Sequence, residues 1–341
     1  MNSSVLPVLN IADFLVNPHS EAAKLFVTEL ARACHDPGFF YLVGHGISDV
    51  KDNDIMAIAE RFFALPANQR YEIAIGKSPH FRGYTILGDE VTQGKNDWRD
   101  QLDIGPEEPA ISMAKEDPAW LRLRGPNQWP VSLPQMQDIV TDWMKQIEGL
   151  CQTLIQGLAL GLGLDQNYFT DRLCPDPYTR LKIARYPAQP KHQVSKQQSN
   201  QGLGLHQDSG LFTLILQDST PGLQVEIDDE LQTITPRKGA YVINLGEMFQ
   251  AATNGYLRAT RHRVHSPPAG QQRISVAYFM NPRLDAVFEP VKLPPALENL
   301  ANGSQNTNPD DVVYPVFGDN TLKIRMRAHP DVAKKFYSDL L

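Results

Sequence analysis

Cysteine is scarce in this chain: Cys34, Cys151 and Cys174 are the only three in 341 residues. An odd number at such wide spacing provides neither a disulfide framework nor a Cys-x-x-Cys metal site. Cys34 and Cys151 fall in apolar, helical-looking surroundings, where a thiol packs as a small hydrophobic side chain. We therefore expect a protein of a reducing compartment, the cytoplasm.

An excess of positive charge and long apolar runs are also lacking. The 32 Lys and Arg residues against 39 Asp and Glu give a formal net charge of -7, whereas a nucleic-acid-binding protein presents a basic face to phosphate. No apolar run approaches the length that spans a bilayer. The first residues lack the charged-then-apolar order of a secretory signal. We expect no nucleic acid and no membrane as partner, and a globular monomer or homodimer.

Helical periodicity dominates the first half of the chain. Apolar residues recur at helical spacing over 20–34 and 50–65, and a longer stripe predicts one long helix over 133–164. The intervening segment 79–134 is rich in Gly, Pro and Trp, with too many aromatic residues for a disordered linker. We interpret it as a packed, irregular excursion that borders a site.

Short β-like runs separated by turn residues fill the second half. They cover 181–186, 211–216, 223–227, 241–244, 262–264 and 274–279. Regularly spaced short strands after a helical half predict a mixed α and β fold, a sandwich or jelly-roll barrel with helices packed outside. The polar stretch 190–202 predicts a mobile loop, and 329–341 predicts a last helix.

The tripeptide His206-Gln207-Asp208 follows that polar stretch. In an extended strand residues i and i+2 point the same way, so His206 and Asp208 can reach one metal ion while Gln207 points away. Alone the motif is weak, because it also occurs on solvated surface strands. Its small and apolar neighbours favour a metal site, since a free carboxylate is costly to bury. Such ligands suit Fe(II), although Zn²⁺ binds them too.

A third ligand is ambiguous between His262 and His265. The two would face opposite sides of a strand, so only one can join the site, and periodicity does not choose between them. Arg273 and Ser275 share one face of the following strand, where a guanidinium fork matches a carboxylate bidentately. Tyr186 offers a phenolic donor from an adjacent strand. Arg-x-Ser is a common tripeptide, and a surface arginine is the alternative.

Together these motifs resemble the 2-oxoglutarate and Fe(II)-dependent oxygenases of the isopenicillin N synthase-like group. The resemblance is close to bacterial members described as iron/ascorbate or isopenicillin N synthase family oxidoreductases. The matching pieces occur in the family's order and spacing at 36–46, 81–84, 100–105, 206–208, 222–225, 244–247, 253–255, 262–264, 273–275 and 278–279. The resemblance covers nearly the whole chain, and this combination is specific although each motif alone is not.

The resemblance implies the fold and the site residues. It implies a double-stranded β-helix (jelly-roll) core over 179–290, with a helix-rich region 1–178 packed around it and a C-terminal extension 291–341. It implies that His262, not His265, joins His206 and Asp208 as metal ligand. Arg273, Ser275 and Tyr186 then bind the distal carboxylate of 2-oxoglutarate. Ala184 departs from the family, because many plant members have asparagine there. Arg82 and Trp98 are candidates for the substrate pocket.

The resemblance also implies the reaction. We expect a dioxygenase that uses Fe(II), 2-oxoglutarate and O2, with ascorbate as a stimulant, and oxidises a small molecule while releasing succinate and CO2. Hydroxylation is the leading outcome, and desaturation or ring closure are alternatives. Two rival functions stay open: an Fe(II) oxidase of isopenicillin N synthase type that uses no 2-oxoglutarate, and a non-catalytic barrel that binds a small carboxylate.

Overall fold

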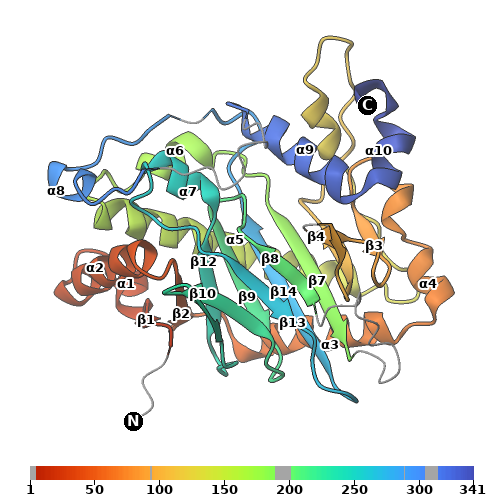
Figure 1. Cartoon of the computed structure of the whole chain (residues 1–341), viewed down its shortest axis with the longest axis horizontal. Coiled ribbons are helices and arrows are strands. Elements are labelled where there is room, and N and C mark those ends of the chain that lie inside the picture. The colour runs from red at the N-terminus through yellow and green to blue at the C-terminus, as the bar shows by residue number, and fades with distance from the viewer. Residues whose placement is uncertain (1–4, 93, 189–200, 288, 304–313) are drawn as a thin grey trace.

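Two β-sheets form the centre of the molecule, as the computed structural model shows (Figure 1). The structure describes residues 5–92, 94–188, 201–287, 289–303 and 314–341. The large sheet has the order β1 (Val8–Asn10), β2 (Phe39–Val43), β12 (Tyr241–Leu245), β9 (Phe212–Gln217), β14 (Gln272–Met280), β7 (Arg180–Pro187), β6 (Asp100–Ile104) and β3 (Gly83–Thr85). The small sheet has the order β11 (Glu230–Thr233), β10 (Leu223–Ile227), β13 (His262–His265) and β8 (Gln201–His206).

From β7 onward the chain alternates between the two sheets, which is the connectivity of a jelly roll. β7, β9, β12 and β14 lie in the large sheet, and the strands between them lie in the small one. Apolar residues of both sheets meet in one buried cluster, which includes Tyr41, Ile215, Val225 and Val264. The mixed α and β fold with a double-stranded β-helix core is therefore confirmed.

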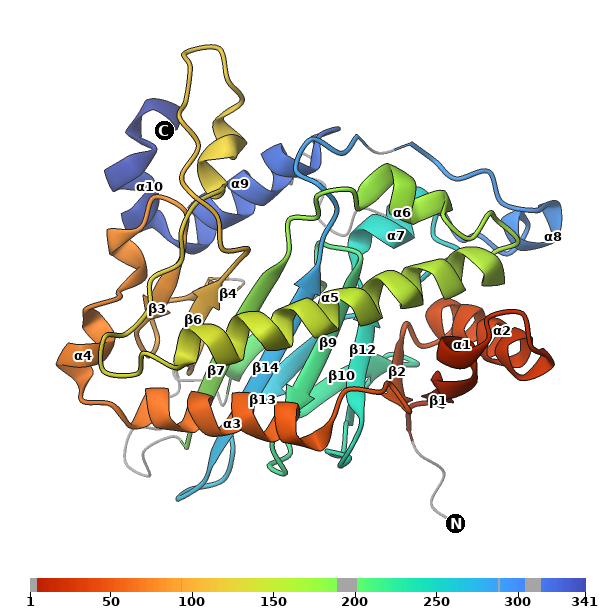
Figure 2. The same ribbon diagram turned by 180° about the vertical axis from the view of Figure 1, so that it is seen from behind.

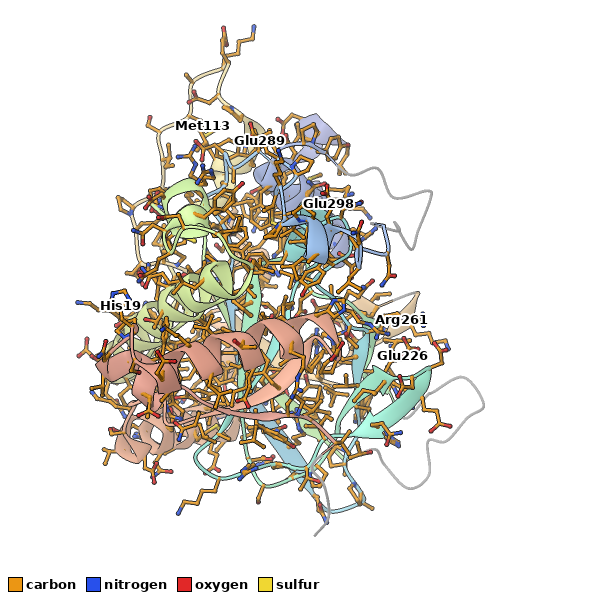
Figure 3. All side chains as sticks on the ribbon, turned by 90° about the vertical axis from the view of Figure 1, so that its left-hand side faces the viewer. His19, Met113, Glu226, Arg261, Glu289 and Glu298 are labelled. Carbon is orange, nitrogen blue, oxygen red and sulfur yellow. The ribbon has the colours of Figure 1, made fainter. Side chains whose placement is uncertain are left out.

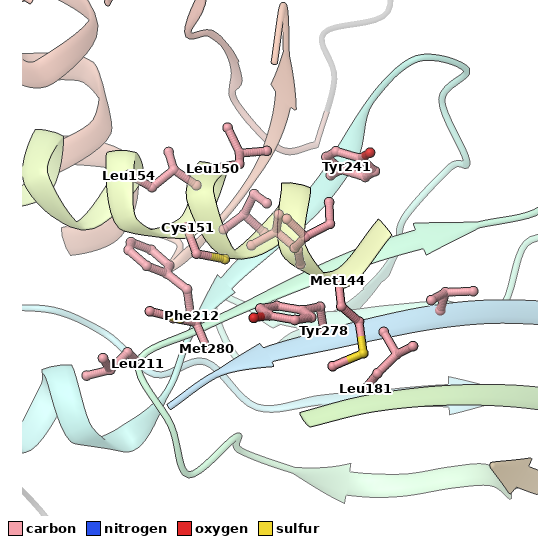
Figure 4. Packing of buried hydrophobic residues seen from close by; sticks show 14 of the residues in the cluster. Met144, Leu150, Cys151, Leu154, Leu181, Leu211, Phe212, Tyr241, Tyr278 and Met280 are labelled. Atoms are coloured by element: carbon pink, nitrogen blue, oxygen red, sulfur yellow. The ribbon is translucent and has the colours of Figure 1, made fainter. Parts of the chain in front are cut away.

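Helix α5 (Met136–Gly161) covers the outer face of the large sheet, together with α3 (Asp49–Ala64) (Figure 2). Its apolar stripe places Cys151 and Leu154 against Phe212 and Tyr278 of the sheet (Figure 4). Each large apolar side chain buried in this way contributes on the order of 2 kcal/mol. The predicted long helix is thus present, although it is shorter at both ends.

Helix α2 (Glu21–His35) packs beside α5 and begins at a capped residue, since the Ser20 hydroxyl accepts a hydrogen bond from the Ala23 N–H at 3.1 Å. A Cβ atom at Gly161 would lie 2.8 Å from the Val27 carbonyl oxygen, so only glycine permits this approach of the two helices. The remaining helices are α1 (Ala12–Val16), α4 (Ala67–Tyr71), α6 (Tyr168–Leu173), α7 (Glu247–Ala252), α8 (Pro295–Glu298), α9 (Phe317–Ala328) and α10 (Pro330–Phe336), with 3-10 turns η1 (Ile75–Lys77), η2 (Ala119–Leu123) and η3 (Ser338–Leu340). No helix in the described ranges is long and apolar enough to cross a bilayer.

The expectation of irregular structure over 79–134 is wrong in part. Strands β3 and β6 extend the large sheet beyond β7, and β4 (Val91–Thr92) and β5 (Lys95–Asn96) form a hairpin. The polar residues of β6 are buried among charged partners, so its strand carries no apolar alternation. The last helix is also shorter than predicted, and α9 was not expected. Residues 190–200 of the predicted loop lie outside the described residues, and its last two, Gln201 and Gly202, belong to β8.

Candidate metal centre

His206 and His262 are neighbours across the small sheet. His206 ends β8, His262 begins β13, and the two residues pair directly in the antiparallel register. Their ring centroids are 4.3 Å apart. Asp208 follows two residues after β8 ends, so the prediction that His206 and Asp208 share one strand is wrong. The turn that leads to β9 brings the carboxylate to the two imidazoles instead.

The three side chains form one compact group of ligand atoms. The distance from His206 Nε2 to Asp208 Oδ1 is 3.5 Å, and that from His262 Nε2 to Asp208 Oδ2 is 3.9 Å. One ligand atom from each of the three residues lies within 4.8 Å of the others. This spacing is what a single ion at the centre would require, because bonds from nitrogen or oxygen to such a metal are about 2 Å long.

Backbone carbonyls fix the orientation of both imidazoles. His206 Nδ1 lies 2.8 Å from the Gly204 carbonyl oxygen, and His262 Nδ1 lies 3.1 Å from that of Thr260. Each Nδ1 therefore carries the proton, and each Nε2 presents its lone pair to the site. Burial, followed by the neighbouring His206, lowers the pKa of His262 to about 4, so this imidazole is neutral at neutral pH.

Asp208 is buried and held from two sides. Its Oδ2 accepts hydrogen bonds from Thr213 Oγ1 at 2.5 Å and from Asn244 Nδ2 at 2.8 Å. Burial alone would raise the pKa of Asp208, but the two histidines and Asn244 hold it far below its ordinary value. Within the described part of the chain, no Lys or Arg lies in ion-pair distance of this carboxylate. A buried anion facing two lone pairs fits a divalent cation.

The start of β13 is anchored from outside the barrel. Arg261, directly before His262, donates to Glu226 of β10 through Nε at 2.6 Å and Nη2 at 2.7 Å. The two side chains lie next to each other at the edge of the molecule (Figure 3). A bidentate pair of this kind fixes direction as well as distance, and therefore helps to hold His262 in register with His206.

A pocket between the two sheets contains the group, with about 470 Å³ of space including its opening to solvent. Its walls combine the three candidate ligands with residues from both sheets and with Arg99, which precedes β6. They are Arg99, Lys182, Ala184, Tyr186, Leu203, His206, Asp208, Thr213, Ile215, Leu223, His262, Val264, Arg273, Ser275, Ala277 and Phe279. All the predicted metal and cosubstrate residues therefore face one space.

Arg273 is a buried cation without a carboxylate partner in the described structure. Its Nη1 donates to Ser275 Oγ at 3.2 Å and its Nη2 to Gln217 Oε1 at 2.8 Å, while Nε and Gln217 Nε2 are buried without partners. The guanidinium carbon lies 5.2 Å from the ring centroid of Tyr186. Unused donors on a buried guanidinium fit a carboxylate ligand, so the residues present suit one end of 2-oxoglutarate.

The two candidates for substrate contact lie outside the pocket lining. Arg82 is almost fully buried and packs against Tyr178, with its guanidinium carbon 5.3 Å from the ring centroid. Trp98 is half-buried and its backbone N–H bonds the Gln201 carbonyl oxygen at 2.9 Å. His265 is also outside the pocket lining, at the far end of β13.

Sequence reasoning missed four residues of the site. Thr213 and Asn244 bond Asp208, and Arg99 and Lys182 line the pocket. Asn244 and Lys182 had a usable signal, because each is a polar residue in an apolar β-like run. Thr213 had the same signal within the run 211–216, whereas Arg99 had none, because it reaches the site only through the packing of the hairpin that precedes β6.

The geometry and the comparisons with known proteins agree on the class of the molecule. Residues 6–132 match the family model described as non-haem dioxygenase in morphine synthesis N-terminal, and residues 167–282 match that of the 2OG-Fe(II) oxygenase superfamily. The 2-oxoglutarate-dependent dioxygenase frbJ of Dothideomycetidae sp. (strain 11243) is 31% identical, with 100% of this chain and 95% of that protein aligned. The chain therefore belongs to the 2-oxoglutarate and Fe(II)-dependent oxygenase superfamily.

Two further similarities extend over most of the chain. Homoarginine-6-hydroxylase 2-ODD-C23.2 of Arabidopsis thaliana is 32% identical over 85% of this chain and 81% of its own length. The crystal structure of a full-length Neurospora crassa protein in complex with alpha-KG superposes with a TM-score of 0.72 at 25% identity, covering 87% of this chain and 92% of that one. The protein is a non-haem dioxygenase that uses Fe(II) and 2-oxoglutarate.

Proposed function

We propose that His206, Asp208 and His262 hold the Fe(II), and that Arg273, Ser275 and Tyr186 bind the distal carboxylate of 2-oxoglutarate. The observation that carries this assignment is the shared pocket: three ligand atoms within 4.8 Å and a buried, incompletely bonded guanidinium face the same space. When bound, the iron with O2 and 2-oxoglutarate supplies an oxidant for a C–H bond and releases succinate and CO2.

The residues of the chain orient the metal ligands, bind the cosubstrate and exclude water from the pocket. The two imidazoles are kept in the ligating tautomer by backbone carbonyls, and Asp208 is kept ionised by its hydrogen bonds. Arg273 fixes one end of the cosubstrate, and Ser275 supports its guanidinium. Ile215, Leu223 and Phe279 make the pocket walls apolar, which excludes water that would consume the oxidant. The proposed product is a hydroxylated small molecule.

The substitution Asp208→Ala tests this assignment. We expect purified Asp208→Ala protein to lose stoichiometric Fe(II) and to form no succinate, because two imidazoles alone leave the site without its anion. His265→Ala is the matched control, and it should keep both iron and activity. Iron content measured on anaerobically loaded protein decides the outcome, and full iron binding by Asp208→Ala would contradict the assignment.

An anaerobic titration separates the proposed enzyme from an oxidase that uses no cosubstrate. We expect a visible charge-transfer band when 2-oxoglutarate is added to the Fe(II) protein, and a much weaker affinity for 2-oxoglutarate in Arg273→Gln.

Among small molecules, homoarginine is the first compound to test for stimulated succinate formation, since relatives over 30% identical are named homoarginine-6-hydroxylases.

We also propose the division of the chain into 1–178, the core 179–290 and the extension 291–341. The sheet-to-sheet alternation that begins at β7 supports the first boundary. Cytoplasmic location, as a monomer or homodimer, is proposed as well. The three buried free thiols support a reducing compartment.

A further inference from the structure

The inner face of β7 carries cations beyond the proposed cosubstrate anchor. Alternate residues of a strand share a face, and Lys182, Ala184 and Tyr186 all line the pocket. Arg180 has the same parity, and its guanidinium carbon lies 5.3 Å from the ring centroid of Phe279, another pocket residue. Arg180 is therefore on the pocket side of β7, at the end farthest from Tyr186.

A row of residues paired across three neighbouring strands of the large sheet leads from Arg180 to the candidate metal ligands. Phe279 of β14 pairs with Arg180 on one side and with Thr213 on the other, and Thr213 donates to Asp208. Neighbouring strands are about 4.8 Å apart, so the Cα atoms of Arg180 and Thr213 are separated by roughly 10 Å. A small molecule bound at Arg180 can thus reach the ligand group with its other end.

Arg180 lacks a hydrogen-bond or ion-pair partner among the described residues. It makes no ion pair or hydrogen bond with them, its Nε is buried without a partner, and the side chain keeps partial exposure. The contact with the Phe279 ring is a cation–π contact, which provides no hydrogen-bond acceptor for the guanidinium N–H groups. Burial, followed by repulsion from Arg325, lowers the pKa of Arg180 to about 10, so it is still cationic at neutral pH.

The buried carboxylates of this region are already paired. Glu90 bonds Lys182 Nζ through Oε1 at 3.0 Å and Arg99 Nη2 through Oε2 at 2.6 Å. Asp103 pairs with Arg325 at 3.1 Å. The cations here outnumber the anions. Asp103 attracts Arg180 electrostatically, but no described carboxylate forms an ion pair with it. A half-buried cation of this kind is available to an anion from outside the chain.

We propose that Arg180 binds a carboxylate of the primary substrate. This inference rests on the proposed function, and it names the substrate class as a small organic acid whose oxidised carbon lies several bonds from the acid group. Glu90 and Asp103 are already paired with cations of the chain, so no carboxylate is left there to bind a cationic group of the substrate. Arg180 would then be to the substrate what Arg273 is to the cosubstrate, at the opposite end of the same strands.

The test uses the Fe(II) and 2-oxoglutarate complex under anaerobic conditions. Propionate and benzoate are compared with their neutral amides, and homoarginine with its amide, which keeps both cationic groups and lacks only the carboxylate. Binding is followed by the rise in melting temperature. We expect at least one acid to bind saturably while its amide does not. Arg180→Gln should weaken that binding roughly tenfold or more, and Arg180→Lys should lie between, because it keeps the charge without the fork.

The controls separate this inference from the proposed function. Arg32→Gln removes an exposed arginine of α2 and should leave acid binding unchanged. Arg180→Gln should leave the 2-oxoglutarate band and its titration unchanged, whereas Arg273→Gln should not. If wild-type protein gives no such band, the proposed function fails. If the band is normal but no acid is preferred to its amide, or Arg180→Gln binds the acid equally well, this inference alone is overturned.

Discussion

Asn244 helps to hold Asp208 in place, because it donates one of the two hydrogen bonds that Asp208 Oδ2 accepts; Thr213 donates the other. We predict that Asn244→Ala weakens Fe(II) binding by about 10- to 100-fold, the usual effect of removing a partner that orients a metal ligand. An anaerobic Fe(II) titration followed by the 2-oxoglutarate band measures it.

Asn127→Ala is the matched control for this substitution. Asn127 bonds Gly105 and Glu107, far from the ligands in the hydrogen-bond network, and its loss should leave iron affinity within error of wild type. Equal iron affinity in Asn244→Ala and wild type would show that Thr213 alone orients the carboxylate.

Single residues were predicted well where a motif carries the chemistry. His206, Asp208 and Arg273 were each found from their residue type and spacing, and the structure brings them into one pocket. The choice of His262 over His265 as metal ligand needed the family resemblance, because the residues around the two histidines favour neither of them. Arg180 went unnoticed, since an arginine at the start of a β-like run has no local sign that its partner is missing.

The hairpin β4–β5 is tied to β8 through one buried carboxylate. Asp97 Oδ1 accepts from the Gly204 N–H at 3.0 Å and from Gln201 Nε2 at 2.9 Å, and Oδ2 accepts from Thr92 Oγ1 at 2.7 Å. Gly204 in turn accepts from His206, so the hairpin braces the strand that carries a metal ligand.

We predict that Asp97→Asn lowers the free energy of unfolding by about 1–3 kcal/mol, because an amide turns N–H groups toward buried donors. Iron affinity should fall together with stability, since β8 loses a fixed point next to His206. Urea unfolding and iron titration on the same samples measure both. Asp89→Asn removes an exposed carboxylate from the same loop and should change neither quantity.

Helices and strands could be predicted where their apolar residues recur at helical or strand spacing. The long helix α5 and the strands β9, β10, β12 and β14 follow their apolar patterns closely. β6 does not, because its Asp100, Gln101 and Asp103 are buried by ion pairs and hydrogen bonds rather than by apolar contact. A strand stabilised in this way is invisible to a pattern of hydrophobicity.

For the molecule as a whole, acid should loosen the contact between the C-terminal helices and the barrel. His329 is buried beside Arg325 of α9, Glu90, Asp103 of β6 and Lys182 of β7. Burial, followed by Arg325, lowers its pKa from an ordinary 6.5 to about 4. Because the folded pKa lies below that of the unfolded chain, the contribution to stability is present above pH 6.5 and is lost as the pH falls toward 4.

We predict that this loss amounts to as much as about 3 kcal/mol, and that His329→Gln, which takes up no proton, loses less over the same interval. Urea unfolding at a series of pH values measures the difference between the two proteins. Burial raises the pKa of Asp103, but Arg325, Lys182 and His329 together lower it to about 2, so the effect of this carboxyl falls in a lower pH window. Parallel pH curves for the two proteins would exclude His329 as the cause.

The placement of β6 beside β7 has a consequence for protein engineering. The eight-stranded sheet is built from both sides of residue 178, so Asp103 and Lys182 are direct neighbours across a ladder although they lie far apart in the chain. A chimera that exchanges only the jelly-roll core with that of a relative would join a foreign strand to this edge and mismatch its charges. Transplanting substrate preference between relatives therefore requires that β6 and β7 travel together.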